Sequence, residues 1–450
     1  MNDTSGDTIC MQLAALTSAI ASTPLASEII EETRLCFLDF IASTLAAPMT
    51  PAVTEMTKLF GSGQAKMLHN SAPASVAGAA FVHGYLSTVE DIDDAHALAS
   101  GMHLSATVFP AALAITQSKG TMQRDFMRAA VAGYEVAGRL ARSMDQGLRT
   151  RGFHASGAIG PFATCAAACI LLDLDQQQMA HAFGMAASGA GGLFAFLSTG
   201  ADSRHLHAAN ASVAGLVAAT AAKNGNTGPL TAFEGPDGFI GPYSETCDMA
   251  FISTPPPGDD DYEMLNAYHK RFTACGHAIP AITLALELRH RDRVPTDQIK
   301  SVELFGYPAS AKLTNFPAAT VSEAKFSLPI VFALAYLYGD VSPAEMNMSV
   351  INRPEVQSLA QKVQVKEKPE HRAAFPDVRS GSVRIRLTKG QTLTLGTTTP
   401  IGMQGNRLSF SDIANKILVL AHPVLGDERC TRAIEAVSAL TDSGEEFTLF

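Results

Sequence analysis

The densest group of side chains that could do chemistry lies between residues 90 and 103. It holds four carboxylates and two imidazoles: Glu90, Asp91, Asp93, Asp94, His96 and His103. Helix capping or a solvated loop would account for Glu90 and Asp94. These roles account less well for His103, which opens a mostly apolar helix whose N-terminus could hold an anion. Carboxylates also suit Mg²⁺ or Ca²⁺, but the glycine and terminal glutamate of an EF-hand are missing, so we expect no metal.

Three further segments with histidine or a cation also precede predicted helices. They are 151–157 with His154, 202–207 with Arg204 and His207, and 269–277 with Lys270 and His277. Taken singly, each is more typical of a structural or capping segment than of a catalytic one. Together with His103, however, they indicate one shared site for a multiply charged anion.

Several classes of function are not expected. The glycine-rich stretch 188–192 does not follow a predicted strand and does not fit G-x-G-x-x-G, which argues against a dinucleotide site. The chain lacks a G-x-S-x-G elbow and a P-loop. Its net charge of −10 argues against a nucleic-acid partner. The seven cysteines are scattered, and neither a signal peptide nor a membrane span is recognised, so we expect a cytoplasmic protein without a membrane partner.

The elements that would position these residues are mostly helices. Of the 450 residues, 47% are apolar and 17% are charged, and the abundant alanine favours helix. Helical patterns cover 25–47, 125–142, 154–172, 176–187, 207–224, 277–290, 322–338 and 410–440, with a strand at 298–305 and a hairpin at 383–395. We predict a mainly α fold, in which a large all-helical domain is formed by both chain ends and an inserted smaller domain is an α+β lid. The predicted bounds are 1–261 plus 405–450 for the helical domain and 262–404 for the lid.

Five segments spread along the chain carry a resemblance to a known family. They are Asp91 to Ser105, Gly152 to His154, Leu206 and His207, Thr227 to Phe239, and Glu323 to Pro329. On these segments the chain resembles the MmgE/PrpD family, which includes 2-methylcitrate dehydratases, cis-aconitate decarboxylases and iminodisuccinate epimerases. The resemblance implies a helical body with an inserted lid, a site in the cleft between them, a homodimer and no obligatory metal or organic cofactor.

The same resemblance, read position by position, implies which residues form the site. The implied catalytic residues are His103, His154, Asp91 and Lys270, and the implied substrate-binding residues are Arg204, His277, Asp93 and His207. We expect His103 and His154 to transfer protons and Asp91 to orient an imidazole, while the cations hold substrate carboxylates.

The chain departs from the family at Ala95, Arg204 and Ile279, where many members have Thr, Lys and His. Arginine cannot give up a proton as a desolvated lysine can, so Arg204 suits a carboxylate clamp. We expect a cofactor-independent lyase, either a dehydratase or a decarboxylase, that acts on a small di- or tricarboxylic acid by His-mediated proton transfer next to a carboxylate. An epimerase or isomerase of a small dicarboxylate such as iminodisuccinate is the alternative, because it would need the same proton-transfer and carboxylate-binding groups. A catalytically inactive polycarboxylate-binding homologue is the third alternative.

Overall fold

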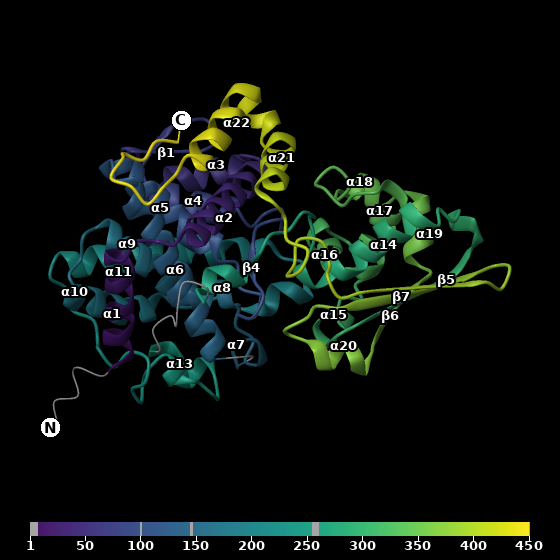
Figure 1. The fold of residues 1–450 in the computed structure, drawn as a ribbon, viewed down its shortest axis with the longest axis horizontal. Coiled ribbons are helices and arrows are strands. Elements are labelled where there is room, and N and C mark those ends of the chain that lie inside the picture. The colour runs from purple at the N-terminus through teal and green to yellow at the C-terminus, as the bar shows by residue number, and fades with distance from the viewer. Residues whose placement is uncertain (1–7, 100, 145–146, 254–260, 450) are drawn as a thin grey trace.

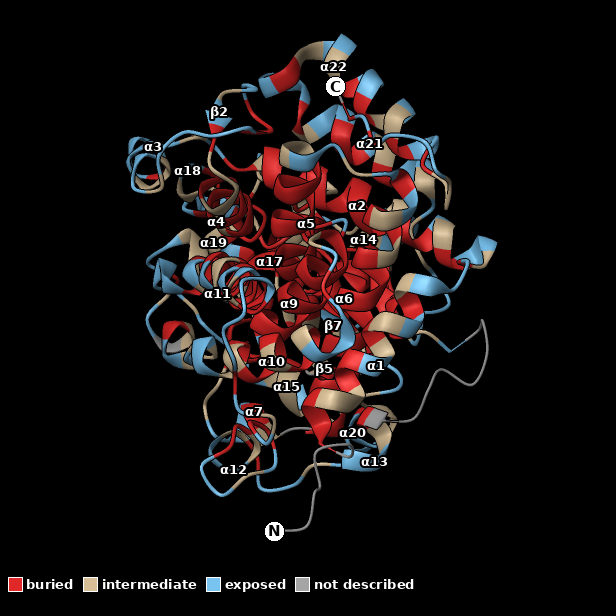
Figure 2. Ribbon diagram, turned by 90° about the vertical axis from the view of Figure 1, so that its left-hand side faces the viewer, coloured by how far each residue is buried: buried red, intermediate tan, exposed pale blue. Residues whose placement is uncertain are grey.

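The computed structural model describes residues 8–99, 101–144, 147–253 and 261–449, and this part of the chain is mainly α-helical (Figure 1). Alanine and leucine recur in the helix interiors, where they lose little side-chain entropy. Buried residues gather along the centre of the molecule and exposed residues lie at its periphery (Figure 2). The prediction of a mainly α fold is therefore confirmed.

One group of helices surrounds an apolar core to which both ends of the chain contribute. The buried residues of this core run from Ile9 to Ala267 and again from Ile413 to Leu449. The helices are α1 (Ile9–Ser22), α2 (Ser27–Ala46), α3 (Pro51–Lys58), α4 (Val76–Leu86), α5 (Ser105–Lys119), α6 (Gln123–Ser143), α7 (Gly147–Thr150), α8 (Ala155–Ala158), α9 (Gly160–Leu171), α10 (Gln176–Ala186), α11 (His205–Lys223), α12 (Ile240–Tyr243), α13 (Met249–Ser253), α21 (Phe410–Leu420) and α22 (His422–Ser438). The C-terminal pair, α21 and α22, returns to pack against α2 (Figure 1).

A second apolar core lies beside the first, and apart from Ala95 its buried residues come from 268–403. Its elements are β4 (Ala267–Tyr268), α14 (Ile279–Arg291), β5 (Ile299–Gly306), α15 (Pro308–Ala311), α16 (Val321–Lys325), α17 (Leu328–Tyr338), α18 (Met348–Ile351), α19 (Pro354–Ala360), β6 (Val363–Glu367), α20 (Pro369–Ala374), β7 (Gly381–Leu387) and β8 (Thr392–Thr397). In Figure 1 these green elements stand to one side of the purple and teal helices.

The second core includes a four-stranded sheet with the order β6-β5-β7-β8. β5 runs parallel to β6, and the other neighbouring strands are antiparallel. Val383, Ile385 and Leu387 of β7 are buried, whereas Arg384 and Arg386, which alternate with them, are not. This alternation is the pattern that predicts the hairpin, and the strand predicted at 298–305 corresponds to β5.

Three predicted helices are divided in the structure. The helical pattern over 154–172 becomes α8 and α9. The helical pattern over 322–338 becomes α16 and α17, because Ser327 accepts a hydrogen bond from Ile330 N and so caps a new helix. The pattern over 410–440 becomes α21 and α22, and Pro423 lies in the first turn of α22. A proline is tolerated in that first turn because its missing N–H would have no helical partner there.

No single helix in the described ranges is long and apolar enough to cross a membrane. α1 and α2 have the necessary length and composition only as a pair, across a bend of 104°.

Replacing the buried His83 by glutamine is expected to make stability less sensitive to acid. His83 Nε2 accepts a hydrogen bond from Leu68 N at 3.1 Å. Burial, followed by the charge of His69, lowers the pKa of His83 from 6.5 to about 3. Because the folded pKa is the lower one, the unfolded chain binds the extra proton, and the stability that neutral His83 supports is lost as the pH falls from 6.5 toward about 3.

The difference in unfolding free energy between the wild type and His83→Gln should therefore shrink by about 1.4 kcal/mol per pH unit below the unfolded pKa. Urea denaturation of both proteins across this window measures the difference, and other titrating groups cancel in it. A difference that stays constant with pH would contradict the assigned pKa.

Candidate active site

A two-residue ladder joins the acidic segment to the start of the second core. β3 (Ala95–His96) pairs antiparallel with β4, so that Ala95 lies opposite Tyr268 and His96 opposite Ala267. Residues 91–94 precede β3, and Lys270 follows β4. The register of the ladder therefore sets which acid meets Lys270.

Asp91 lies between two cations that come from different parts of the chain. Lys270 Nζ is 2.6 Å from Asp91 Oδ1, and Arg204 places Nη1 and Nη2 at 2.9 Å and 3.2 Å from the two carboxylate oxygens. Burial alone would raise the pKa of Asp91, but the charges of Arg204 and Lys270 hold it well below its ordinary value. Asp91 also has a left-handed backbone, with φ +53°, which is uncommon outside glycine. It is a buried anion that fixes both cations.

His103 is held by the next acid, Asp93. His103 Nδ1 lies 2.9 Å from Asp93 Oδ2 and 3.1 Å from the backbone oxygen of Asp94. Both partners are acceptors, so Nδ1 carries a proton, and Nε2 is the ring nitrogen through which His103 can give or take a proton. The expectation that Asp91 orients an imidazole is not met at this ring, because Asp91 contacts Arg204 and Lys270 and leaves His103 to Asp93.

Glu90 and Asp94 both have structural partners: Asp94 binds a backbone N–H at a helix start, whereas Glu90 forms an ion pair and caps no helix. Glu90 Oε2 lies 3.0 Å from Lys325 Nζ. Asp94 Oδ1 accepts a hydrogen bond from Ser105 N at the start of α5, and Asp94 Oδ2 accepts one from Tyr134 OH at 2.7 Å. These contacts fix the loop on which Asp91 and Asp93 stand.

His154 begins α8 and contacts a second histidine, His207 of α11. Their Nδ1 atoms lie 2.9 Å apart, so one ring donates to the other. Burial and then the charge of His207 lower the pKa of His154 well below its ordinary value. Burial and then the charge of Arg204 lower the pKa of His207 to about 4. Both rings are therefore neutral near pH 7, and the ring of His154 lies 6.1 Å from that of His103, between centroids.

A cavity of about 730 Å³ is lined by residues from 91–204, the part of the chain that contains the first core, and from 268–379, the part that contains the second core. The predicted site residues that line it are Asp91, His103, His154, Arg204 and His277. The other predicted residues, Asp93, Lys270 and His207, are not among its lining residues, and Asp93 and Lys270 have no exposed surface. All three contact a lining residue from behind: Asp93 contacts His103, His207 contacts His154, and Lys270 contacts Asp91.

His277 is a neutral group in this cavity. Its Nδ1 lies 3.0 Å from Tyr307 OH, and the Tyr307 ring stacks on Phe375 with 4.5 Å between centroids. Burial, followed by the charges of Arg379 and Arg149, lowers the pKa of His277 well below its ordinary value. It can therefore donate or accept a hydrogen bond but does not add a positive charge.

Three lining residues that the sequence analysis did not assign are Arg149, Tyr268 and Arg379. Arg149 lies over the Phe194 ring, 3.6 Å from its centroid. A signal existed close by, since the basic segment at 151–157 starts two residues later. Arg151 itself points elsewhere, with Nη2 3.5 Å from Glu245. Arg379 lies in a loop before β7, where no motif marks it.

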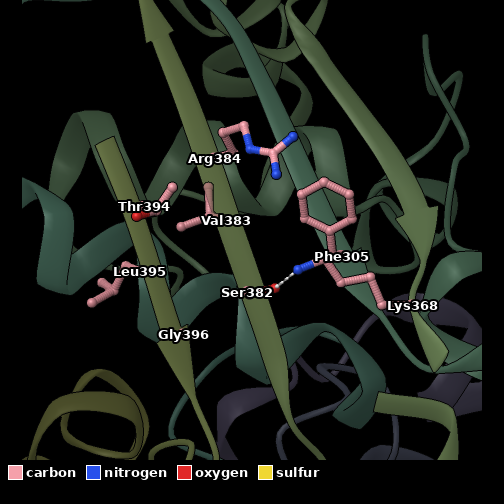
Figure 3. A pocket seen from close by; sticks show the side chains of 8 residues that line it. All are labelled: Phe305, Lys368, Ser382, Val383, Arg384, Thr394, Leu395 and Gly396. Atoms are coloured by element: carbon pink, nitrogen blue, oxygen red, sulfur yellow. Dashed lines mark hydrogen bonds between the residues drawn. The ribbon is translucent and has the colours of Figure 1, made fainter. Parts of the chain in front are cut away.

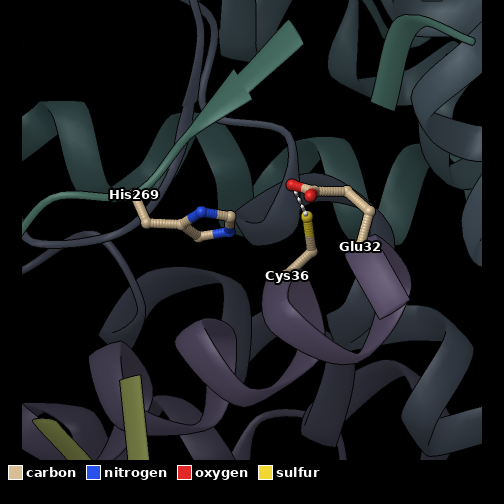
Figure 4. Close-up of side chains that lie close together, drawn as sticks. All are labelled: Glu32, Cys36 and His269. Carbon is tan, nitrogen blue, oxygen red and sulfur yellow. Dashed lines mark hydrogen bonds between the residues drawn. The ribbon is translucent and has the colours of Figure 1, made fainter. Parts of the chain in front are cut away.

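Two groups of donor atoms could suggest a metal. Donor atoms of Asp91, Asp93 and His103 lie within 4.8 Å of one another, but Lys270 and Arg204 already supply positive charge there. A second group is drawn in Figure 4: Glu32, Cys36 and His269. Arg407 donates to Glu32, and burial with the charges of Arg407 and Lys416 lowers the pKa of His269 to about 3. A cation would meet these charges, so we assign a metal to neither group.

A smaller hollow lies on the sheet, between β5, β7 and β8 (Figure 3). Its two cations already have acidic neighbours, because Lys368 lies 3.2 Å from Glu370 and Arg384 lies 3.4 Å from Glu303. The hollow has no histidine or carboxylate in its lining, so it offers no group for proton transfer near neutral pH.

Close backbone contact behind His154 depends on glycine. A Cβ on Gly157 would lie 2.5 Å from the backbone oxygen of Gly191, and the neighbouring Gly192 has φ +97°. Gly192 also accepts the hydrogen bond from His154 N at 3.0 Å. The glycine-rich stretch thus allows the chain to approach α8 closely.

Gly157→Ala is therefore expected to displace the segment that holds His154. We expect it to lower the unfolding free energy by about 1–3 kcal/mol and to reduce turnover. Gly191→Ala is the matched control, since a Cβ at Gly191 would meet nothing within 4 Å. Thermal unfolding and turnover measure both effects, and equal behaviour of the two variants would contradict this account.

Comparisons with known proteins identify the family of this chain. Residues 11–252 match the MmgE/PrpD N-terminal domain and residues 272–442 match the MmgE/PrpD C-terminal domain, so the chain belongs to the MmgE/PrpD family. A cis-aconitate decarboxylase of Homo sapiens is 26% identical over 442 residues, which cover 93% of this chain and 89% of that protein. A cis-aconitate decarboxylase of Mus musculus is also 26% identical, over 81% of this chain and 75% of its own length. A cis-aconitate decarboxylase of Aspergillus terreus is 23% identical, over 94% of this chain and 91% of its own length.

Proposed function

We propose that the protein is a lyase that releases CO₂ from a small polycarboxylic acid such as cis-aconitate, with no cofactor taking part. The observation that carries this proposal is the pair of imidazoles, His103 and His154, which face one cavity and are each held at Nδ1. The relatives described above support decarboxylation over dehydration among the lyase reactions.

The proposed chemistry needs one proton and no oxidant. The C–C bond to the departing carboxylate breaks, CO₂ leaves, and the electron pair stays on the substrate carbon. An imidazolium then donates its Nε2 proton to the carbanion and becomes a neutral imidazole. His103 suits the acid role, because Asp93 at 2.9 Å stabilises its imidazolium form.

The cations around the cavity suit the remaining charge of the substrate. Arg204 lines the cavity, and Lys270 lies directly behind it with Asp91 between them. Both Nη atoms of Arg204 already contact Asp91. Arg204 can therefore bind a substrate carboxylate only through the side of its guanidinium that faces the cavity. We assign Lys270 as a positioning residue and not as a catalytic one, because it has no exposed surface.

We further propose that residues 262–404 act as a lid over the helical body of 1–261 and 405–450, and that the protein is a cytoplasmic homodimer. The lining of the cavity by residues from both parts of the chain supports the lid. The family resemblance supports the homodimer, and light scattering of the purified protein tests it.

The first test of the proposed function mixes the purified protein with a panel of acids in D₂O and follows them by proton NMR, with and without EDTA. The panel contains cis-aconitate, citrate, 2-methylcitrate and an imino acid derived from aspartate. Loss of CO₂ with uptake of one deuterium, insensitive to EDTA, is the expected result. Loss of water would indicate a dehydratase, and exchange at an α-carbon without bond cleavage would indicate an epimerase. Binding without any reaction would indicate an inactive homologue, and either of the last two results would overturn the lyase proposal.

A further inference from the structure

Arg379 is a buried arginine in the wall of the cavity, on the loop between α20 and β7. Its side chain is 6% exposed. Nη1 donates to Tyr268 OH at 3.0 Å and Nη2 donates to the backbone oxygen of Ala97 at 3.1 Å. Both partners are neutral, because burial raises the pKa of the Tyr268 hydroxyl above its ordinary value.

Among the residues that the structure describes, Arg379 is a buried cation without an acidic partner, unlike the other buried cations. Six lysines and arginines are buried within the described ranges: Arg139, Arg204, Lys270, Lys325, Arg379 and Lys416. Five of them lie within ion-pair distance of Glu135, Asp91, Asp91, Glu90 and Asp39 respectively. Within the same ranges, Arg379 forms no ion pair with a carboxylate. A buried charge without a counter-charge is costly, so an anion is expected to complete it.

The hydrogen-bonding capacity of Arg379 is also incomplete. A guanidinium has five N–H donors, and two of the bonds that Arg379 makes are described above. Its Nε atom is buried and has no hydrogen-bond partner among the described residues. The forked donors of arginine match a carboxylate, which is the acceptor that suits the remaining N–H donors best.

Tyr268 and Gly276 help to hold this guanidinium in place. Its Cζ lies over the Tyr268 ring, 4.8 Å from the centroid. A Cβ on Gly276 would lie 2.1 Å from Tyr268 OH and 3.4 Å from Arg379 Nη1, so glycine leaves the room that the pair occupies. His277, the next residue, lines the same cavity.

We infer that Arg379, braced by Tyr268, forms a second carboxylate subsite, which binds a substrate carboxylate other than the one next to the reacting carbon. The inference rests on the proposed function and narrows it, because it selects substrates with at least two carboxylates besides any that leaves. Arg204 cannot replace Arg379 in this role, since both of its Nη atoms are engaged by Asp91. Of the two buried cations that line the cavity, Arg204 is thus committed to the protein and Arg379 is available to the ligand, whereas the other lining cations, Arg149 and Lys312, are exposed.

The test compares the wild type with Arg379→Gln, Arg379→Lys and the control Arg372→Gln. Arg372 is an exposed arginine of α20, paired with Glu367, and lies outside the cavity. The ligands are propane-1,2,3-tricarboxylate and butyrate, which do not react, measured by isothermal titration calorimetry. Turnover of the active acid from the NMR panel gives kcat and KM, and circular dichroism confirms that each variant is folded.

We expect Arg379→Gln to weaken tricarboxylate binding and to raise KM by roughly 10- to 100-fold, with a smaller change in kcat. Butyrate binding should be unchanged, Arg379→Lys should be intermediate because it keeps the charge without the fork, and Arg372→Gln should match the wild type. The inference is overturned if Arg379→Gln binds the tricarboxylate as tightly as the wild type, or if it loses both ligands equally. In those cases the wild type still converts a panel acid and the proposed function stands. If the wild type neither binds nor converts any of the acids, the proposed function fails as well.

Discussion

Alanine at His103 is expected to lower kcat by roughly 10²- to 10⁴-fold, the range typical for loss of a general acid or base. The reason is local: Nδ1 is held by Asp93, and Nε2 is the ring nitrogen left to face the cavity. KM should change far less, since the substrate carboxylates are held by other groups. Steady-state kinetics on the acid identified by NMR measures both constants.

The matched control for this variant is His290→Ala. His290 is an exposed histidine in the last turn of α14 and takes no part in the cavity. Asp93→Asn tests the same proton transfer through the hydrogen-bond partner of His103. We expect it to lower kcat because the amide cannot stabilise an imidazolium. Near wild-type turnover of a folded His103→Ala protein would remove His103 from the mechanism.

Methionine at Lys270 is expected to lower the unfolding free energy by about 3–5 kcal/mol, the cost of breaking a buried ion pair from one side. Lys270 has no exposed surface and lies 2.6 Å from Asp91 and 3.6 Å from Asp93. Burial alone would lower the pKa of Lys270, but the two carboxylates raise it above its ordinary value, so the amine is charged. Its removal leaves Arg204 as the remaining cation that pairs with Asp91 among the described residues.

Urea denaturation measures this loss, with Lys300→Met as the control because Lys300 is exposed on β5. The double variant Asp91→Asn/Lys270→Met should recover part of the loss, with a coupling of about 0.5–3 kcal/mol between the two sites. Full additivity of the two single variants would show that the pair does not stabilise the fold.

The helices of this protein could be predicted because their patterns are local. α6, α10 and α11 correspond to the predicted segments 125–142, 176–187 and 207–224. β6 could not be predicted, since Val363–Glu367 has two apolar residues and is a strand because β5 pairs with it. The short ladder of β3 with β4 is likewise a long-range pairing that no local pattern contains.

In the candidate site, too, some residues could be predicted from local sequence and others could not. Residue type and position before a helix are local properties and made His103 and His154 candidates, but their assignment as catalytic residues came from the family resemblance. The partner of His103 could not, because Asp91 and Asp93 are the same residue type two positions apart, and long-range contacts with Arg204 and Lys270 decide between them. Arg379 could not be selected either. What distinguishes it is that it forms no ion pair among the described residues, and the sequence does not show which residues lie near it in space.

The pairing of β3 with β4 also limits where the chain can be truncated or recombined with a relative. A fragment that ended before β4 would keep His103 and His154 and most of the first core, but it would lose Lys270, which follows β4 and neutralises Asp91. Two acids would then be buried with Arg204 as the one cation of this cluster left to them in the described part of the chain. The helical body is therefore a poor candidate for expression by itself. If the second part is exchanged between relatives, β4 and Lys270 should stay with the first part, so that Asp91 and Lys270 come from one parent and the recombination breakpoint lies downstream of Lys270.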